Sequence, residues 1–149
     1  MKKFIFIVIM VVCGLTGTMS AQTNKGSDYN YQKAEEVMRE KGDVKKAMEY
    51  LRKQLDIDPE HMDSYLMMIG LYRNEKEYGS ALQVANKALK INPKKSNVSD
   101  GLLYWWRSVI YEEMGDNTKA AADMEKAVKV TKKGRDRSWR DIMIAYAQM

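Results

Sequence analysis

The side chains that could do chemistry in this chain are few and widely separated. His61 is the one histidine and there is one cysteine, so neither a His/Cys zinc cluster nor a nucleophile–histidine pair can be built without His61. The neighbouring carboxylates Glu35–Glu36 and Glu112–Glu113 diverge in direction on a helix, and we interpret them as solvated. The sequence has no glycine-rich phosphate-binding loop. We therefore expect no catalysis, no cofactor and no metal, and we interpret His61 as a solvated turn residue.

Composition predicts one modest domain made of helices. The chain has 149 residues, of which 45% are hydrophobic and 30% charged, an ordinary globular mixture. Strand-type alternation of Val, Ile and Thr does not occur. The formal net charge is +5. A charge of this size does not by itself indicate a nucleic-acid partner, and we expect none.

The first 21 residues form a segment of their own. Two lysines precede an apolar run at residues 4–12, and small residues follow as far as Ala21. This is the pattern of a secretory signal peptide, and we predict cleavage after Ala21. The apolar run is shorter than the roughly 20 residues that a bilayer span needs. The alternatives are an uncleaved anchor and a lipid-modified Cys13, although Val12 stands where a lipoprotein needs a small residue.

Export would place the mature chain in a bacterial periplasm or cell envelope. Without residues 1–21, the 25 basic residues fall to 23 against 20 acidic ones, so the mature chain is weakly basic. It would contain no cysteine, so its stability must come from helix packing and not from disulfides. We interpret residues 22–27 as a short flexible lead into a folded domain at 28–149.

A fixed period organises the rest of the chain. Pro59 and Pro93, the only two prolines, stand 34 residues apart, and each follows a similar segment with a helical pattern. A period of this size indicates stacked copies of one helical unit. Gly-Asp pairs at 42–43 and 115–116 separate further helices. We predict helices near 28–41, 44–57, 62–75, 78–91, 101–114, 117–131 and 136–149.

The paired helices carry complementary faces. Tyr65, Ile69 and Tyr72 share one face of a first helix, because they are spaced at helical intervals. Small residues mark the second helices: Ala47, Ala81, Ala85, Ala88, Ala120 and Ala127. Small side chains allow helix axes to approach closely. We therefore expect the aromatic face of one helix to pack against the alanine face of its partner.

These residues closely resemble the tetratricopeptide repeat family, whose unit is a 34-residue helix-turn-helix. The best-matching unit carries Tyr65, Tyr72, Ala81, Ala88 and Pro93. The resemblance implies an all-α, right-handed solenoid of three repeats, about 28–61, 62–95 and 101–135, followed by a terminal helix at 136–149. The chain departs from the family pattern at two places. Glu35 stands where a small residue is usual, and a polar run at 94–100 lengthens one turn.

The resemblance also implies a binding surface. In this family the first helix of each unit lines a concave groove that takes a peptide or protein partner. Adjacent residues point about 100° apart on a helix, so we expect only one of Trp105 and Trp106 to be core, and we assign Trp105 to the groove. Carried over position by position, the groove residues are Gln32, Glu36, Arg39, Leu66, Arg73, Asn74, Leu102, Trp105, Val109, Glu112 and Arg140.

The function expected from these observations is an exported scaffold that binds a protein or peptide in its groove. One alternative is a regulatory or substrate-positioning module of a larger envelope enzyme or complex. Another is a carbohydrate-binding module that uses Trp105 and Tyr29 as stacking platforms. We expect membrane contact only through the signal peptide. The terminal helix lacks a paired helix, so it could associate with a copy of itself and form a homo-oligomer.

Overall fold

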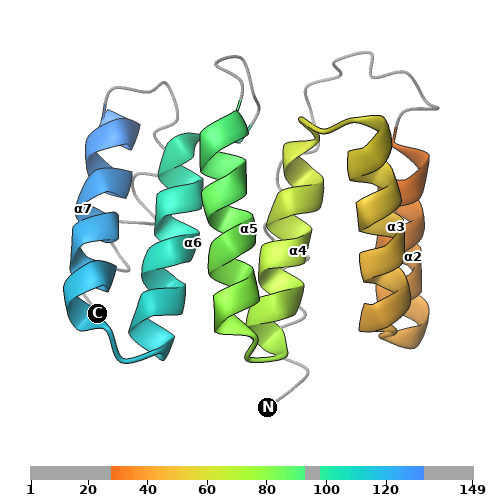
Figure 1. Cartoon of the computed structure of the whole chain (residues 1–149), viewed down its shortest axis with the longest axis horizontal. Coiled ribbons are helices and arrows are strands. Elements are labelled where there is room, and N and C mark those ends of the chain that lie inside the picture. The colour runs from red at the N-terminus through yellow and green to blue at the C-terminus, as the bar shows by residue number, and fades with distance from the viewer. Residues whose placement is uncertain (1–27, 93–97, 133–149) are drawn as a thin grey trace.

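The computed structural model describes residues 28–92 and 98–132, and within these ranges it contains helices and no strand. Figure 1 shows the helices side by side, following one another in chain order along the long axis. Their bounds are α2 (Tyr29–Lys41), α3 (Val44–Ile57), α4 (Met62–Asn74), α5 (Tyr78–Ile91), α6 (Asp100–Glu113) and α7 (Asn117–Lys132). The first helix of each pair, α2, α4 or α6, is called an A helix below, and the second, α3, α5 or α7, a B helix.

The predicted helices agree with the structure to within one residue at each end for all six described helices. The helices α3 and α5 end at Ile57 and Ile91, two residues before Pro59 and Pro93. Proline cannot continue a helix, which is why both helices stop there. The predicted signal peptide, the lead at 22–27 and the terminal helix at 136–149 lie outside the described residues.

Side chains just ahead of the helices fix where the helices begin. The Asp43 side chain accepts a hydrogen bond from the Lys46 N–H of α3 at 3.0 Å. The Ser99 hydroxyl oxygen accepts one from the Leu102 N–H of α6 at 3.2 Å. Each bond satisfies a backbone donor that the first turn of a helix leaves without an intrahelical partner.

The turn after each A helix requires a left-handed backbone conformation. Gly42 and Gly115 provide it after α2 and α6, with φ of 61° and 81°. Lys76 occupies the corresponding turn after α4 with φ of 61°, although it has a Cβ atom. Hydrogen bonds from the Lys76 N–H to the Arg73 carbonyl and from the Glu77 N–H to the Tyr72 carbonyl hold this turn in place. Lys76 therefore carries a backbone strain that the other two turns avoid.

Replacing Lys76 by glycine is expected to stabilise the protein. Lys76 is exposed, so the substitution removes no buried contact. Glycine relieves the left-handed strain, but it also has more conformational freedom in the unfolded chain, which offsets part of the gain. The net free energy of unfolding should rise by about 0.5–1 kcal/mol. Urea denaturation measures the change. Lys76→Ala, which keeps the Cβ atom, serves as the control, and an equal gain in both variants would show that the strain is not the cause.

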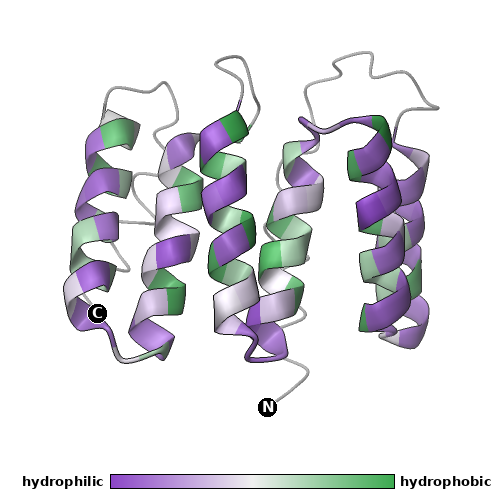
Figure 2. Cartoon of the chain, in the orientation of Figure 1, coloured by the Kyte–Doolittle hydropathy of each residue, from purple (hydrophilic) through white to green (hydrophobic). Residues whose placement is uncertain are grey.

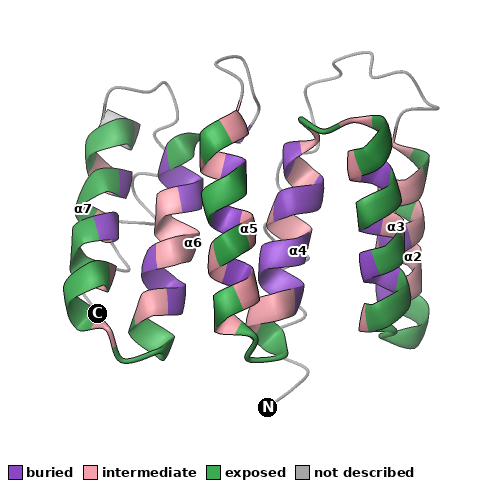
Figure 3. Cartoon of the chain, viewed as in Figure 1, coloured by how far each residue is buried: buried purple, intermediate pink, exposed green. Residues whose placement is uncertain are grey.

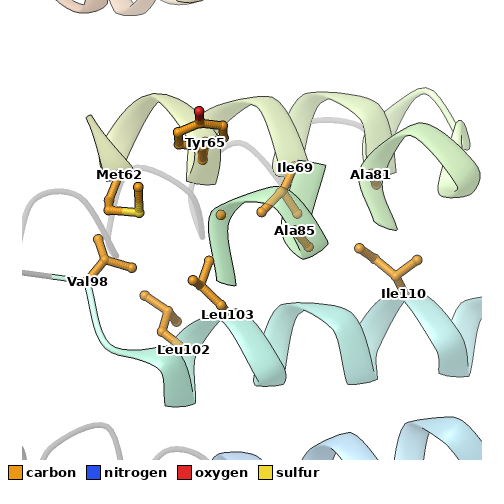
Figure 4. Packing of buried hydrophobic residues seen from close by; sticks show 10 residues of the cluster. Met62, Tyr65, Ile69, Ala81, Ala85, Val98, Leu102, Leu103 and Ile110 are labelled. Carbon is orange, nitrogen blue, oxygen red and sulfur yellow. The ribbon is translucent and has the colours of Figure 1, made fainter. Parts of the chain in front are cut away.

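The core is continuous from one helix pair to the next. Figure 4 shows Ile69 of α4, Ala81 and Ala85 of α5 and Leu103 of α6 meeting in one cluster. The predicted packing of an aromatic face against an alanine face is confirmed in the second pair, where Tyr65 and Tyr72 join the cluster that contains Ala81, Ala85 and Ala88. Ala47 and Ala127 are also fully buried, whereas Ala120 is half-buried. A second cluster around Ala34 and Leu51 joins α2 and α3 to α4. Each helix pair thus completes the interior of its neighbour.

A buried ion pair ties α5, α6 and α7 together. The Arg107 guanidinium donates to Asp123 Oδ2 through Nε at 2.8 Å and to Asn86 Oδ1 through a terminal nitrogen, also at 2.8 Å. The side chain of Asp123 is 3% exposed and that of Arg107 17% exposed. The remaining Asp123 oxygen accepts from Lys126 at 3.2 Å. Since both members of the pair are largely removed from water, each depends on the other for its solvation.

A buried glutamine holds the N-terminal end of α2. Gln54 of α3 is fully buried, and its side-chain oxygen accepts a hydrogen bond from the Tyr31 N–H at 3.3 Å. Asp28, at the N-cap of α2, makes no side-chain capping bond. Gln54 of the neighbouring helix α3 therefore caps the first turn of α2 in place of a local N-cap side chain.

Candidate partner-binding surface

The A helices α2, α4 and α6 provide the surface on which the sequence places the groove. We call the exposed and half-buried side chains of these three helices the A face. Successive A helices contact one another through side chains: Arg73 of α4 pairs with Glu113 of α6, and His61 at the start of α4 approaches Asp28 at the start of α2. The A face is therefore one connected surface and not three separate ridges.

Four of the predicted groove residues are exposed. Gln32 and Arg39 lie on α2, Asn74 on α4 and Glu112 on α6, so every A helix contributes at least one. Their side chains offer an amide, a cation, a second amide and a carboxylate to solvent. Such a set suits hydrogen bonds to the backbone and polar side chains of an extended peptide.

Two further predicted residues are half-buried and engaged within the chain. Glu36 pairs with Lys33 one turn away on α2, at 2.6 Å, and this pairing holds the pKa of the Glu36 carboxyl below its usual value. Arg73 directs its guanidinium at both carboxylate oxygens of Glu113, with Nε 3.0 Å from each. A partner that uses Arg73 or Glu36 must compete with these bonds.

The two tryptophans of α6 share one environment, contrary to prediction. Trp105 and Trp106 are both half-buried and both pack against the main core cluster, so neither is the core member of the pair. Their rings meet edge to face with centroids 5.2 Å apart. The Arg73 guanidinium lies 5.9 Å from the Trp106 ring, so it is Trp106 that reaches the neighbouring A helix. Leu66 of α4 is also half-buried beside this cluster.

Leu102 and Val109 do not belong to an exposed groove, and the prediction for these two residues is wrong. Their exposed fractions are 8% and 4%. The helix α6 contacts α4, α5 and α7, so a broad arc of it is buried, including positions that the repeat pattern leaves open. In Figure 4, Leu102 lies beside Leu103 and Val98 in the core cluster. Arg140, the last predicted groove residue, lies outside the described residues.

Glu35 brings a carboxylate into the contact between the first two A helices. It is half-buried, in keeping with the expectation that this repeat position departs from the family pattern. Partial burial raises the pKa of the Glu35 carboxyl, and the nearby Asp63 charge raises it further. A hydrogen bond with Tyr31 and the charge of Arg39 lower it, so they offset part of the effect. The net direction is upward because desolvation is the largest cause.

Glu35→Gln is expected to stabilise the protein at neutral pH. A carboxyl whose pKa is raised by folding contributes stability that is fully present below its unfolded pKa of about 4.3 and is lost as the pH rises through the higher folded pKa. The charged Glu35 therefore costs stability at pH 7, and the neutral amide avoids this cost. Thermal unfolding should give a higher midpoint for Glu35→Gln than for wild type at pH 7, with the gap closing near pH 4. A lower midpoint at pH 7 would contradict this account.

His61 is not the solvated turn residue that the sequence suggested. Its side chain is 12% exposed, and it begins α4 by accepting a hydrogen bond from the Ser64 N–H at 3.2 Å through Nδ1. Its Nε2 lies 3.4 Å from Asp28 Oδ1, and its ring lies 5.2 Å from that of Tyr31. His61 therefore caps a helix and joins the first two A helices. Its place two residues after Pro59, where α4 starts, is the sequence signal that could have indicated a cap.

A cleft of about 450 Å³ lies between α3 and the end of α4. Val44, Met48, Leu71 and Tyr72 form part of its lining, which also includes charged side chains of both signs. None of the predicted groove residues lines it. Within the described part of the chain, no group of His, Cys, Asp and Glu side chains could hold a metal ion. No helix described by the structure has the length and hydrophobicity needed to cross a bilayer.

Comparison with known proteins agrees with this architecture. Two tetratricopeptide repeat models match the sequence, one over residues 38–102 and the other over residues 102–133, so together they cover most of the chain. The chain belongs to the tetratricopeptide repeat family. The predicted fold class, a solenoid of helix-turn-helix repeats, is thereby confirmed. Repeats of this family are typical of non-catalytic scaffolds for protein–protein interaction.

A solved structure supports the same assignment of fold for this tetratricopeptide repeat protein. The N-terminal domain of stress-induced protein-1 (STI-1) from C. elegans superposes with a TM-score of 0.63 at 15% sequence identity. The match covers 83% of this chain and 98% of that one. At this level of identity the likeness concerns the fold alone. A search of curated proteins finds no match.

Proposed function

We propose that this protein is an exported scaffold that binds a peptide or protein segment across its A face. The connected A face is the observation that carries the proposal. Neighbouring A helices touch through Arg73–Glu113 and His61–Asp28, as expected on the concave side of a curved array, where successive units come closest. Side chains on such a side converge on a common space, which a bound segment can fill.

The composition of the A face favours an extended polar segment with an apolar anchor. Gln32, Arg39, Asn74 and Glu112 are exposed on the face, and Leu66 of α4 and Trp105 of α6 are half-buried on the same helices. Aromatic and arginine side chains often dominate the energetics of interfaces. The surface therefore combines polar groups that set the register of a peptide with a small apolar area that gives affinity.

A pull-down from an envelope extract tests the role of the A face. The variant Arg39→Ala/Asn74→Ala/Glu112→Ala changes one exposed residue on each A helix. The matched control Lys46→Ala/Gln83→Ala/Glu125→Ala removes a cation, an amide and a carboxylate from the three B helices. We expect the first variant to lose bound proteins that wild type and control retain. Equal capture of bound proteins by wild type, variant and control would show that the A face is not the binding surface.

Export is tested separately by N-terminal sequencing of the protein recovered from the cell envelope. A mature chain that begins at Gln22 would agree with cleavage of a signal peptide. A chain that retains Met1 at the membrane would favour the anchor alternative. Recovery in the cytosol with an intact N-terminus would contradict export. The groove proposal can survive that last result, because its own test depends on the A face alone.

A further inference from the structure

The charges of this protein are divided between its two sets of helices. The exposed residues of α2, α4 and α6 include two cations and four carboxylates. We call the exposed residues of α3, α5 and α7 the B face. Its charged members are three carboxylates, Glu49, Asp56 and Glu125, and nine cations, Lys45, Lys46, Arg52, Lys53, Lys87, Lys90, Lys119, Lys126 and Lys129.

Most cations of the B face are not neutralised by the protein itself. Lys119 pairs with Asp116 at 2.7 Å, and Lys126 pairs with Asp123 at 3.2 Å. Among the described residues, none of the other seven forms an ion pair. Two of them lie over aromatic rings, Lys53 over Tyr50 and Lys87 over Tyr65, which leaves their charge in place. The B face therefore presents a net positive field to any large anionic surface.

The three B helices lie on one side of the molecule. Figure 3 shows many exposed residues on α3 and α7 and a mixture of exposed and covered residues on α5, whereas α4 and α6 between them show mostly buried and half-buried ones. Figure 2 shows hydrophilic residues along the same three helices. Cations from all three helix pairs can thus meet a single surface at once.

We propose that the B face docks onto a bilayer surface rich in anionic phospholipid. Eight of its nine cations are lysines, which act as hydrated point charges and lack the fork that arginine offers for bidentate recognition. Such a set suits a diffuse layer of anionic headgroups better than one defined ligand. The described exposed residues of α3, α5 and α7 include no aromatic ring, and single-stranded nucleic acid is usually bound by base stacking.

Docking of this kind would be peripheral and would orient the protein. No described helix could cross the bilayer, so the contact is with headgroups. The A face would then point away from the membrane and stay open to a partner. This inference goes beyond the groove proposal and does not depend on it. It departs from the expectation that only the N-terminal segment meets a membrane.

Vesicle co-sedimentation tests the proposal. The chain that begins at Gln22 keeps every described helix and lacks the apolar N-terminal run, and its helicity is first matched to the full chain by circular dichroism. Its binding is measured on phosphatidylcholine vesicles with and without about 30% phosphatidylglycerol, at about 0.1 M salt. We expect the protein to partition onto the anionic vesicles roughly a hundredfold or more strongly than onto the neutral ones, and we expect this preference to weaken as salt is raised.

A pair of charge-matched variants assigns the effect to one face. Lys87→Gln/Lys90→Gln removes two exposed cations from α5, and Arg39→Gln/Lys41→Gln removes two from α2. Each lysine is expected to contribute about fivefold to partition onto the anionic vesicles, so the α5 variant should partition about 25-fold more weakly than wild type. The α2 variant should stay within about twofold of wild type. Equal losses in both variants, or no preference for anionic vesicles, would overturn the proposal. Tighter binding to a DNA duplex than to the vesicles would also overturn it, in favour of a nucleic acid partner.

Discussion

Asp123→Ala is expected to lower the free energy of unfolding by about 3 kcal/mol, which makes it one of the two most damaging substitutions that we foresee. The change leaves the Arg107 guanidinium, which is 17% exposed, without the carboxylate that it contacts at 2.7–2.8 Å. A largely buried cation without its charged partner has a desolvation cost that the remaining hydrogen bond to Asn86 offsets only in part. Urea denaturation measures the effect, as a drop of roughly 2 M in the midpoint.

Two further variants separate the buried charge from helix propensity and volume. Glu125→Ala changes an exposed acid on the same helix, so it should alter stability by less than about 0.5 kcal/mol. Replacing both partners, in Arg107→Met/Asp123→Leu, removes the uncompensated charge and should restore most of the loss. If Asp123→Ala were as mild as Glu125→Ala, the ion pair would not hold α6 to α7.

Leu103→Ala is the second large effect. Leu103 is fully buried in α6, where it joins the cluster formed by α4 and α5 (Figure 4). Its truncation removes methyl groups and leaves a cavity that the surrounding helices fill only in part. The free energy of unfolding should fall by about 2–5 kcal/mol in the same urea measurement.

Ile57→Ala provides the control for the loss of an aliphatic side chain. Ile57 is 66% exposed at the end of α3, so its substitution should cost less than about 0.5 kcal/mol. A Leu103→Ala loss no larger than this would mean that the second and third helix pairs do not share an interior. The stacking of repeats would then need another explanation.

The helices were predictable because their signals are local. Gly42, Gly115 and the two prolines mark turns and ends through backbone geometry alone. The buried alanines recur at helical spacing, so the pattern that predicts a helix also predicts its buried face. For these reasons the fold followed from one sequence with little dependence on long-range contacts.

The candidate site was less predictable, because exposure is set by how many neighbours a helix has. Leu102 and Val109 occupy groove positions by analogy with the family, but α6 contacts three other helices and both side chains are covered. His61 looked solvated as an isolated turn residue, whereas its nitrogen caps α4 and its ring meets Tyr31. Neither outcome can be computed from local spacing.

The Arg107–Asp123 pair has a signal in the sequence that becomes visible only when the repeats are compared position by position. Arg107 stands at the repeat position of Ala34 and Met68, both of which are buried. Asp123 stands at the repeat position of Tyr50 and Val84, which are half-buried and pack against the core. Two opposite charges at positions that are apolar in the other repeats indicate a buried pair, because neither charge could be buried alone.

The most direct measurement of the proposed function is photo-crosslinking in living cells from single exposed positions on each face. A photoreactive amino acid is placed in turn at Gln32, Asn74 and Glu112 on the A helices, and at Lys46, Gln83 and Glu125 on the B helices. We predict adducts of one defined size with a protein partner from the first three positions and none from the last three. Protein adducts from the B positions alone would contradict the account, since the partner would then occupy the opposite face.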